Sequence, residues 1–264
     1  MTIWDPGQYL KFKAERTRPS IDLLNRIEIK SPRRILDVGC GPGNSTAELH
    51  KRWPASKILG IDKSKEMIAR ATADYPKQAC SQTSPDPDWM VCDFERDMSG
   101  LGKFDIIFSN AALHWAPNHE KLFPRLMKQL ESKGAFAVQV PDNSDSLLHT
   151  AMNKVQTSAK WQGFFADIPP KQYGRANVYY DILAPRSTRL DIWSTVYYHV
   201  VDSHQDIIEW IRGTQMRPLL GRLDEAQGTE FMADVLAEIC LAYKPQTDGK
   251  ILMPFKRLFF VAYA

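Results

Sequence analysis

Short apolar runs alternate with amphipathic stretches through the first half of the chain. A short apolar run that ends at an acid or an amide favours a buried strand, and apolar residues at spacings of three and four favour a helix. By these rules the sequence predicts strand 34–39, helix 45–53, strand 57–62, helix 64–75, strand 88–94, strand 104–110, helix 119–131 and strand 134–143. Regular alternation of this kind demands right-handed crossovers and parallel strands. The predicted fold class is therefore α/β, with a mostly parallel sheet.

The regular pattern stops after Asn143. The remaining sequence predicts an irregular stretch with a helical piece at 145–185, then strand 190–199, helix 204–212, a long helix near 223–243 and strand 258–263. The late strands suit an antiparallel edge, and the helices between them a cap. We expect an N-terminal helical lid at 1–30, with helices after Pro6 and from about Arg18, a core at 31–145, and a cap with the last strands at 146–264. An ordinary amphipathic helix with solvated arginines is the alternative for 1–30.

Composition narrows the class of protein. The chain has 264 residues, of which 44% are hydrophobic and 25% charged, which is enough for one domain with a substantial insertion. No apolar run approaches the roughly 18 residues of a membrane span, and the start lacks a signal-like leader, so we expect a soluble cytoplasmic protein. A net charge of +3 is too mild for nucleic-acid binding, and the four cysteines have neither disulfide nor metal spacing.

The strongest motif follows the first predicted strand. Asp37 precedes Gly39, Gly41 and Gly43, and glycines at such positions allow tight turns and let a ligand lie against bare backbone. A dinucleotide site requires Gly-x-Gly-x-x-Gly or Ala, but the last position here is Asn44, which disfavours a nicotinamide cofactor. A glycine turn without any ligand is the structural alternative.

An acid also ends the second and third predicted strands. Asp62 stands at the carboxyl end of the second strand, where an acid can accept hydrogen bonds from both ribose hydroxyls. Asp93 and Phe94 end the third strand at the same edge of the sheet. Helix capping by Asp62 and an ordinary strand-end role for Asp93 are the alternatives.

The acid followed by Gly-x-Gly-x-Gly resembles the first motif of the class I methyltransferases, which use S-adenosylmethionine. The resemblance implies a Rossmann-like fold with a mostly parallel seven-stranded sheet, helices on both faces and a helical cap. It also implies an acid that binds the amino group of the cofactor at Asp37 and adenine contacts at Asp93 and Phe94. The expected cofactor-binding residues are Tyr9, Asp37, Gly39, Cys40, Gly41, Asn44, Asp62, Lys63, Met67, Asp93, Phe94, Asn110, Ala111 and His114.

The segments outside the core predict a small anionic acceptor. They combine arginines, which bind carboxylates in a two-pronged way, with tyrosines and amides. The chain lacks the Asn/Asp-Pro-Pro-Tyr/Phe motif at Asn110, which argues against a nucleic-acid base as the acceptor. Each of these side chains taken alone is more often a solvated or packing residue.

Several motifs resemble the bacterial trans-aconitate 2-methyltransferases over nearly the whole chain, cap included. They include Trp4-Asp5-Pro6, Tyr179-Tyr180-Asp181, Tyr197-Tyr198-His199 and Arg217-Pro218. Two departures from that family are a longer loop around 81–88 and a histidine at His114. The resemblance implies methyl transfer to a carboxylate, giving a monomethyl ester and S-adenosylhomocysteine. The expected substrate-binding residues are Arg16, Arg18, Trp115, Gln139, Asn143, Arg175, Tyr180, Tyr198, His199 and Arg217.

The chemistry of such a transfer requires no general base. A carboxylate with a pKa near 4 is already ionised at neutral pH, and in-line displacement mainly needs the reacting atoms aligned. We therefore expect positioning residues only, with no catalytic base and no metal. A methyltransferase for a phenol or quinone precursor, a non-catalytic cofactor-binding partner protein and a dehydrogenase stay open at this stage, as does the choice between monomer and dimer.

Overall fold

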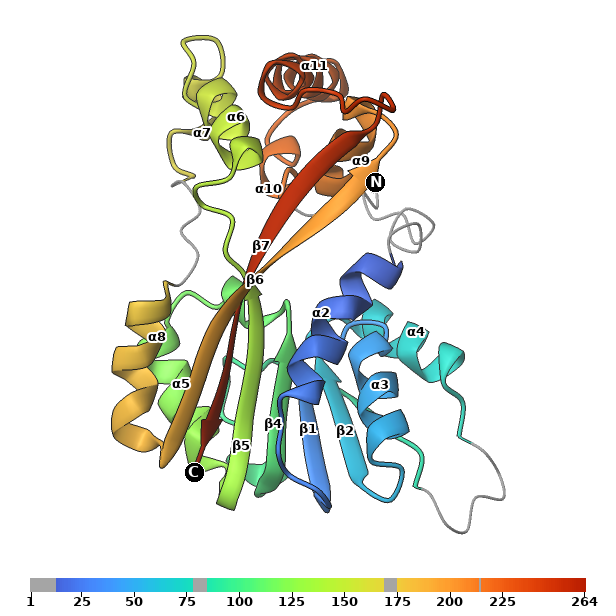
Figure 1. Ribbon diagram of the computed structural model, residues 1–264, viewed down its shortest axis with the longest axis vertical. Coiled ribbons are helices and arrows are strands. Elements are labelled where there is room, and N and C mark those ends of the chain that lie inside the picture. Colours follow the sequence, from blue (N-terminus) through green and yellow to red (C-terminus); the bar gives the residue numbers. More distant parts are fainter. Residues whose placement is uncertain (1–12, 78–84, 169–174, 214) are drawn as a thin grey trace. The chain divides into compact units, whose positions relative to one another are not determined.

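A computed structural model describes residues 13–77, 85–168, 175–213 and 215–264 (Figure 1). The chain divides into two compact units. The core unit comprises Arg16–Asp142, Gly174–Thr195 and Arg257–Ala264, and the described part of the cap unit lies within Lys13–Glu15, Asn143–Tyr173 and Val196–Lys256, so that α2, β6 and β7 each run from one unit into the other. The helix expected after Pro6, together with Tyr9 and Cys80, falls outside the described residues.

A seven-stranded sheet forms the centre of the core unit, with the strand order β3-β2-β1-β4-β5-β7-β6. Its first five strands along the chain pair in parallel, and β7 pairs antiparallel to β5. The strands are β1 (Arg34–Val38), β2 (Lys57–Asp62), β3 (Asp88–Val91), β4 (Phe104–Asn110), β5 (Leu130–Pro141), β6 (Arg189–Val201) and β7 (Ile251–Tyr263). This order and the antiparallel late strand confirm the predicted fold class.

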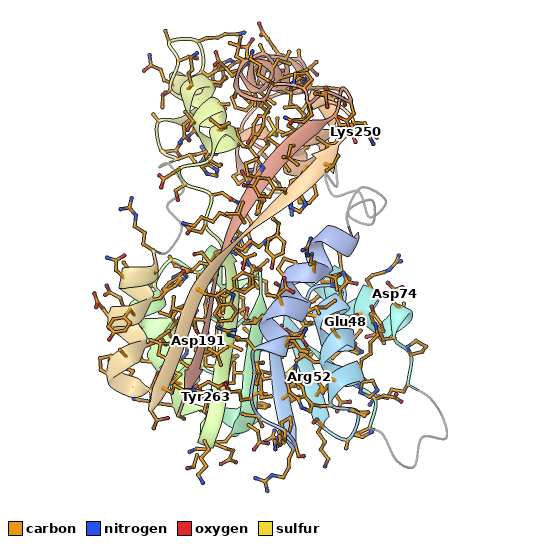
Figure 2. The ribbon with its side chains drawn as sticks, in the orientation of Figure 1. Glu48, Arg52, Asp74, Asp191, Lys250 and Tyr263 are labelled. Carbon is orange, nitrogen blue, oxygen red and sulfur yellow. The ribbon has the colours of Figure 1, made fainter. Side chains whose placement is uncertain are left out.

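The helices of the core unit begin and pack as their sequences direct. They are α2 (Lys13–Asn25), α3 (Asn44–Arg52), α4 (Lys65–Asp74), α5 (His119–Lys128) and α8 (Ala176–Leu183), with short 3-10 turns at Ser99–Leu101, Leu113–Trp115 and Ala184–Arg186. The Ser64 hydroxyl accepts the Met67 N–H at 3.2 Å and caps α4, and the Asn118 side chain caps α5 in the same way. Arg52 of α3, which Figure 2 labels, donates to the Leu24 and Ile27 carbonyls at 2.7 and 2.9 Å and so ties the end of α2 and the residues after it to α3.

An aromatic cluster fills the core between sheet and helices. Phe123 of α5 lies between Phe136 of β5, Phe260 of β7 and Tyr179 of α8, at ring-centroid distances of 5.2 to 5.5 Å. All four side chains are fully buried. Burial of large rings at such distances stabilises the fold by apolar transfer and by edge-to-face contacts.

The cap unit has a hydrophobic core of its own. Its helices are α6 (Leu147–Gln156), α7 (Gln162–Phe165), α9 (His204–Arg212), α10 (Arg217–Leu220) and α11 (Glu225–Ala242). The long helix α11 packs against α6 and α9, and its buried Phe231 contacts Trp161 and Phe165 edge-on. Reciprocal capping boxes fix the starts of α9 and α11.

Several predicted boundaries were wrong. A single helix runs through Pro19, whose ring removes one N–H without ending the helix, so no new helix begins near Arg18. Strand β3 stops at Val91, and β5 and β7 begin at Leu130 and Ile251, earlier than predicted. Pro254 lies near the start of β7, and a proline within an apolar run disfavours a strand.

The stretch 145–185 is also more regular than predicted. It holds α6, α7 and α8, and α8 belongs to the core unit, where Tyr179 and Leu183 are fully buried. Its buried positions recur at intervals of three and four over only eight residues, too few for a clear periodic signal. Within the described part of the chain, no helix combines the length and apolar character needed to cross a membrane.

Candidate functional site

Three glycines shape the loop between β1 and α3. Gly39, Gly41 and Gly43 have φ angles of 72°, 54° and 90°, in the left-handed region that other residues avoid. A Cβ on Gly39 would lie 2.2 Å from the Cβ of Ala112, whereas one on Gly41 would meet nothing within 4 Å. Gly39 is therefore required by close packing, and the backbone at Gly41 faces open space that can receive a ligand.

Asp37 lies beneath this loop and is fully buried. Its Oδ2 accepts hydrogen bonds from the Ser45 and Thr46 hydroxyls at 2.7 and 2.6 Å. Burial, which disfavours the charged form, raises the pKa of Asp37 to about 6 against the opposing effect of both hydroxyls. Its Oδ1 is buried and has no hydrogen-bond partner among the described residues, so it is an acceptor available to a donor-bearing ligand.

Asp62 connects the glycine loop to the start of α4. Its Oδ2 accepts the Gly41 N–H at 3.1 Å, and its Oδ1 accepts the Ser64 N–H at 2.8 Å. A carboxylate oxygen has a second lone-pair site, so these bonds leave acceptor capacity for a sugar diol. Lys63 is exposed and Met67 half-buried beside it. The structural role considered for Asp62 and a ribose-binding role are therefore compatible.

The loop after β3 contains Asp93 and Phe94. The Asp93 Oδ1 accepts the Glu95 N–H at 3.0 Å, and Phe94 is 5% exposed, next to Gly39. The guanidinium of Arg125 in α5 donates to the Phe94 and Glu95 carbonyls at 2.5 and 2.9 Å. Arg125, which the sequence analysis did not identify, thus holds the loop that carries the expected adenine contacts.

The exit of β4 is strained. Ala111 has a φ of 53°, and its N–H donates to the Gln139 carbonyl of β5 at 2.9 Å. Left-handed backbone at a residue with a Cβ costs about 1 kcal/mol and persists where surrounding contacts enforce it. The preceding Asn110 has a buried Oδ1 with no hydrogen-bond partner among the described residues. His114 and Trp115 follow, with ring centroids 4.9 Å apart and Trp115 47% exposed.

A buried arginine lies at the same edge. Arg257 of β7 is 5% exposed, and its Nη1 donates to the Oε1 of the fully buried Gln139 at 3.3 Å. Gln139 was predicted from the sequence, whereas Arg257 was not. A basic residue within an otherwise apolar strand was the available signal.

A tryptophan that the sequence analysis also left out packs beneath the glycine loop. The indole of Trp89 would lie 2.7 Å from a Cβ on Gly43 and 2.8 Å from one on Gly60. Tyr75 packs beside it, with ring centroids 6.0 Å apart. These contacts support the loop from the side of β2 and β3.

The expected substrate residues divide between the two units. Arg18, Trp115, Gln139, Arg175 and Tyr180 belong to the core unit, and Asn143, Tyr198, His199 and Arg217 to the cap unit. The side chain of Arg16 lies outside the described residues, although its backbone belongs to α2. The structure thus brings Asn110, Gln139 and the unpredicted Arg257 together in the core unit.

The cap residues differ in exposure. Tyr198 is 60% exposed, and Arg217 at the start of α10 is also exposed. His199 is buried against Trp210, with ring centroids 4.5 Å apart. Asn143 is buried, and its Oδ1 accepts the Lys256 N–H at 2.8 Å, a contact that joins two segments of the cap unit.

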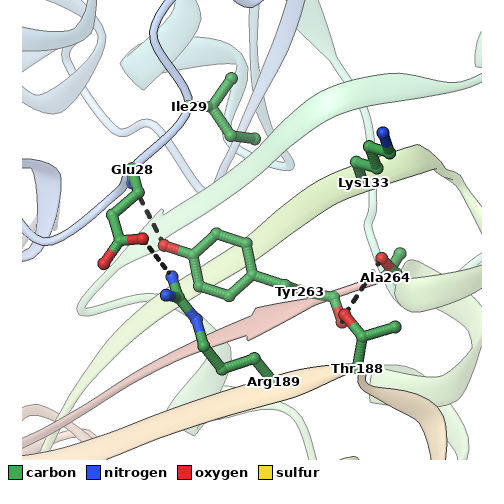
Figure 3. Close-up of a pocket in the computed structure, with 7 residues that line it drawn as sticks. All are labelled: Glu28, Ile29, Lys133, Thr188, Arg189, Tyr263 and Ala264. Carbon is green, nitrogen blue, oxygen red and sulfur yellow. Dashed lines mark hydrogen bonds and ion pairs between the residues drawn. The ribbon is translucent and has the colours of Figure 1, made fainter.

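A separate cavity of about 310 Å³ lies at the opposite strand ends of the core unit (Figure 3). Glu28 and Arg189 form an ion pair across it at 2.7 Å, and the Thr188 hydroxyl donates to the Tyr263 carbonyl at 3.2 Å. Ligands of parallel sheets bind beyond the carboxyl ends of the strands, where the glycine loop lies. This cavity is therefore not part of the candidate site.

The polar groups at the carboxyl edge suit a cationic, sugar-bearing ligand. Asp37 and Asn110 each present a buried acceptor oxygen, Asp62 retains acceptor capacity, and Gly41 faces open space. Acceptors of this kind match an ammonium group and a diol rather than a phosphate, which requires donors. Among the residues that the structure describes, no three His, Cys, Asp or Glu side chains gather as a metal site.

Comparisons with known proteins agree with this geometry. A family model described as a methyltransferase domain matches residues 29–200. A putative methyltransferase from Bacillus halodurans has a similar structure, with a TM-score of 0.63, 12% identity, and coverage of 93% of this chain and 98% of that one.

Curated relatives match over the full length. The trans-aconitate 2-methyltransferase of Yersinia pseudotuberculosis is 44% identical over 100% of this chain and 99% of its own. That of Rhodopseudomonas palustris is 40% identical over 99% of both chains. These matches confirm the predicted resemblance, and the chain belongs to the trans-aconitate 2-methyltransferase family.

Proposed function

We propose that this protein transfers a methyl group from S-adenosylmethionine to a carboxylate of a small polycarboxylic acid, and that the acid is trans-aconitate. The family membership supports the reaction. The observation that carries the proposal is the arrangement at the carboxyl edge of the sheet. An open glycine loop after β1, with acceptor oxygens at Asp37 and at Asn110 of β4, lies at the same edge of the sheet as the buried cation Arg257 of β7, which pairs with β5 next to β4. The products are a monomethyl ester and S-adenosylhomocysteine.

The core unit would hold the cofactor through four groups. Asp37 Oδ1 and Asn110 Oδ1 accept from its amino group, the carboxylate of Asp62 accepts from its ribose, and the backbone at Gly41 lies against it. Asp93 and Phe94 would contact the adenine, and Arg125 holds the loop that carries both residues. When bound, S-adenosylmethionine supplies an activated methyl group on a positively charged sulfur.

The residues of this chain act by orienting the two reactants. The acceptor carboxylate is ionised at neutral pH, so no side chain has to remove a proton from it. Holding two reactants in attack geometry can supply several powers of ten in rate without acid–base chemistry. The left-handed turn at Ala111 fixes the backbone where β4 ends, at the place where the reacting groups would meet.

Substrate recognition falls to the cationic and hydroxyl side chains. Arg175 in the core unit, and Tyr198 and Arg217 in the cap unit, are exposed and can bind carboxylates. His114 and His199 have no required proton to move in this reaction. We assign no catalytic base.

One experiment tests the proposal directly. The protein is incubated with methyl-labelled cofactor and a panel of di- and tricarboxylates, phenols and quinone precursors, and products are identified by mass. We expect a base-labile monomethyl ester of trans-aconitate. Transfer to a phenol, or cofactor binding without transfer to any carboxylate, would contradict the proposal and favour the alternative acceptor or the non-catalytic partner.

A further inference from the structure

Arg257 is a buried cation at the edge of the sheet where ligands bind. It lies opposite Pro141, the last residue of β5, and it is 5% exposed. A guanidinium stays ionised at every pH that a protein tolerates, and its planar N–H groups match a carboxylate in geometry. Arg257 therefore places a fixed positive charge beside the carboxyl end of β5, where an anionic ligand can bind.

Gln139 is oriented by this arginine. A guanidinium can only donate, so the amide oxygen of Gln139 has to face Arg257, as the Nη1 to Oε1 distance of 3.3 Å shows. The Nε2 group must then point the other way. It is buried and has no hydrogen-bond partner among the described residues. An unsatisfied donor of this kind costs roughly 1 to 3 kcal/mol, which a ligand acceptor would recover.

The pair lies beside the exit of β4. Asn110 is the register partner of Gln139, and the Ala111 N–H bonds to the Gln139 carbonyl at 2.9 Å. The donor groups of Arg257 and Gln139 are thus connected, through one hydrogen-bonded strand pair, to the turn assigned to the reacting groups.

We propose that Arg257 and the Nε2 group of Gln139 together bind a non-reacting carboxylate of the polycarboxylate substrate. This inference rests on the proposed function and deepens it. The fork of Arg257 donates to carboxylate oxygens, the amide of Gln139 adds a further N–H, and the second carboxylate of the same molecule is left for methylation. Monocarboxylic acids cannot make both contacts and should be poor substrates.

The test uses the full-length protein and four variants: Arg257→Gln, Arg257→Lys, Gln139→Glu and the control Arg189→Gln. Arg189 lies at the opposite strand ends, where its side chain is 51% exposed. Steady-state kinetics with trans-aconitate, calorimetric binding of S-adenosylhomocysteine and thermal melting are measured for each. The wild type should favour polycarboxylates over monocarboxylates.

Arg257→Gln should raise the KM for the acid about 100-fold and Arg257→Lys about 10-fold, because lysine keeps the charge but loses the fork. Affinity for S-adenosylhomocysteine should stay within about 3-fold of wild type, as expected for a change that spares the donor site. The control should match the wild type in every measurement.

Gln139→Glu separates substrate binding from a purely structural role. A glutamate would pair with Arg257 and preserve or raise the melting temperature, but it would replace the free donor with a charge that repels the acid. We expect KM for the acid to rise about 100-fold in this variant. If Arg257→Gln does not fold, the KM of Gln139→Glu for the acid tests the inference alone.

An unchanged KM in Gln139→Glu, or in a folded Arg257 variant, overturns the inference while the proposed function stands. A wild-type protein that methylates no polycarboxylate overturns the proposed function, and the inference with it.

Discussion

The glycine loop of the core unit and the predicted acceptor residues of the cap unit differ in how firmly they are held. In the core, left-handed glycines leave little freedom, and Ser45 and Thr46 hold the buried Asp37. In the cap, Tyr198 and Arg217 are exposed side chains. Under the proposed function, recognition of the donor depends on backbone geometry, whereas selection of the acceptor depends on side chains that can be replaced.

The largest effect is expected when a single methyl group is added to the glycine loop. Gly39→Ala places a Cβ 2.2 Å from that of Ala112 at a φ of 72°, and neither the backbone nor the β4 exit can move without displacing the loop. We expect loss of S-adenosylhomocysteine binding by at least about 1000-fold, because the loop that contacts the ligand is rebuilt. Calorimetric titration measures it.

Gly100→Ala is the matched control, because a Cβ there meets nothing within 4 Å. Cofactor affinity in this variant should be that of the wild type. Normal affinity in Gly39→Ala would contradict a backbone-defined donor site.

Asp37 should make both the stability of the protein and its affinity for the cofactor depend on pH. Its pKa rises from 3.8 in the unfolded chain to about 6 in the folded protein, so between these values the folded state holds a proton that the unfolded state has released. This contribution to stability is present below about pH 4 and is lost as the pH rises through about 6. The cofactor-free protein should therefore gain stability from this group as pH falls from 7 to 5.

Cofactor affinity should fall, whereas stability rises, as the pH is lowered from 7 to 5. Protonation of Asp37 removes the charge that attracts the ammonium group, so the Kd should rise by up to about 10-fold for each pH unit below 6. Asp37→Asn should lower affinity at pH 7.5 by about 100-fold and abolish this pH dependence. Titrations at several pH values, with wild type as the reference, would contradict the assignment if both proteins gave the same profile.

A substitution in the cap unit should change the KM for the acceptor acid and leave the KM for the cofactor unchanged. Arg217→Ala is expected to raise KM for trans-aconitate about 10-fold and to leave the KM for the cofactor unchanged, because an exposed charge contributes modestly to binding. Arg175→Ala in the core unit should behave alike. Arg222→Ala, which breaks an exposed ion pair with Asp167 at 2.7 Å, serves as the control. Equal effects on both substrates would refute these assignments.

The smallest effect is expected at the far end of the strands. Glu28→Gln breaks the ion pair with Arg189. The side chain of Glu28 is 67% exposed and that of Arg189 is 51% exposed. Exposed pairs of this kind contribute little to stability. Kinetics and melting temperature should match the wild type, and a marked change in KM would mean that the cavity of Figure 3 communicates with the candidate site.

The candidate donor side is easier to predict from the sequence than the candidate acceptor side, for a physical reason. Glycine spacing and strand-ending acids are local signals, so Asp37, Gly39 and Asp62 could be assigned from a few residues each. Arg257 could not, because its importance depends on its pairing with Gln139, 118 positions away in the chain. The apolar residues around Arg257 mark it as unusual, but they do not show which side chain it contacts.

The early starts of β5 and β7 were missed for a similar reason. Lys133, with a φ of 65°, interrupts the pattern before Gly134, although Leu130 already pairs with Phe104. The opening residues of β7 alternate between buried and exposed positions, a pattern set by tertiary surroundings in the cap unit. Pairing partners, rather than propensity, decide where such strands begin.

Trp89 restricts which substitutions this chain tolerates beneath the glycine loop. One indole occupies the space that side chains at both Gly43 and Gly60 would need, although these positions belong to different segments. A larger residue at Gly60 requires a smaller one at position 89, and a larger residue at Gly43 requires smaller ones at both position 89 and position 75. In a combinatorial library these four sites should therefore be varied together.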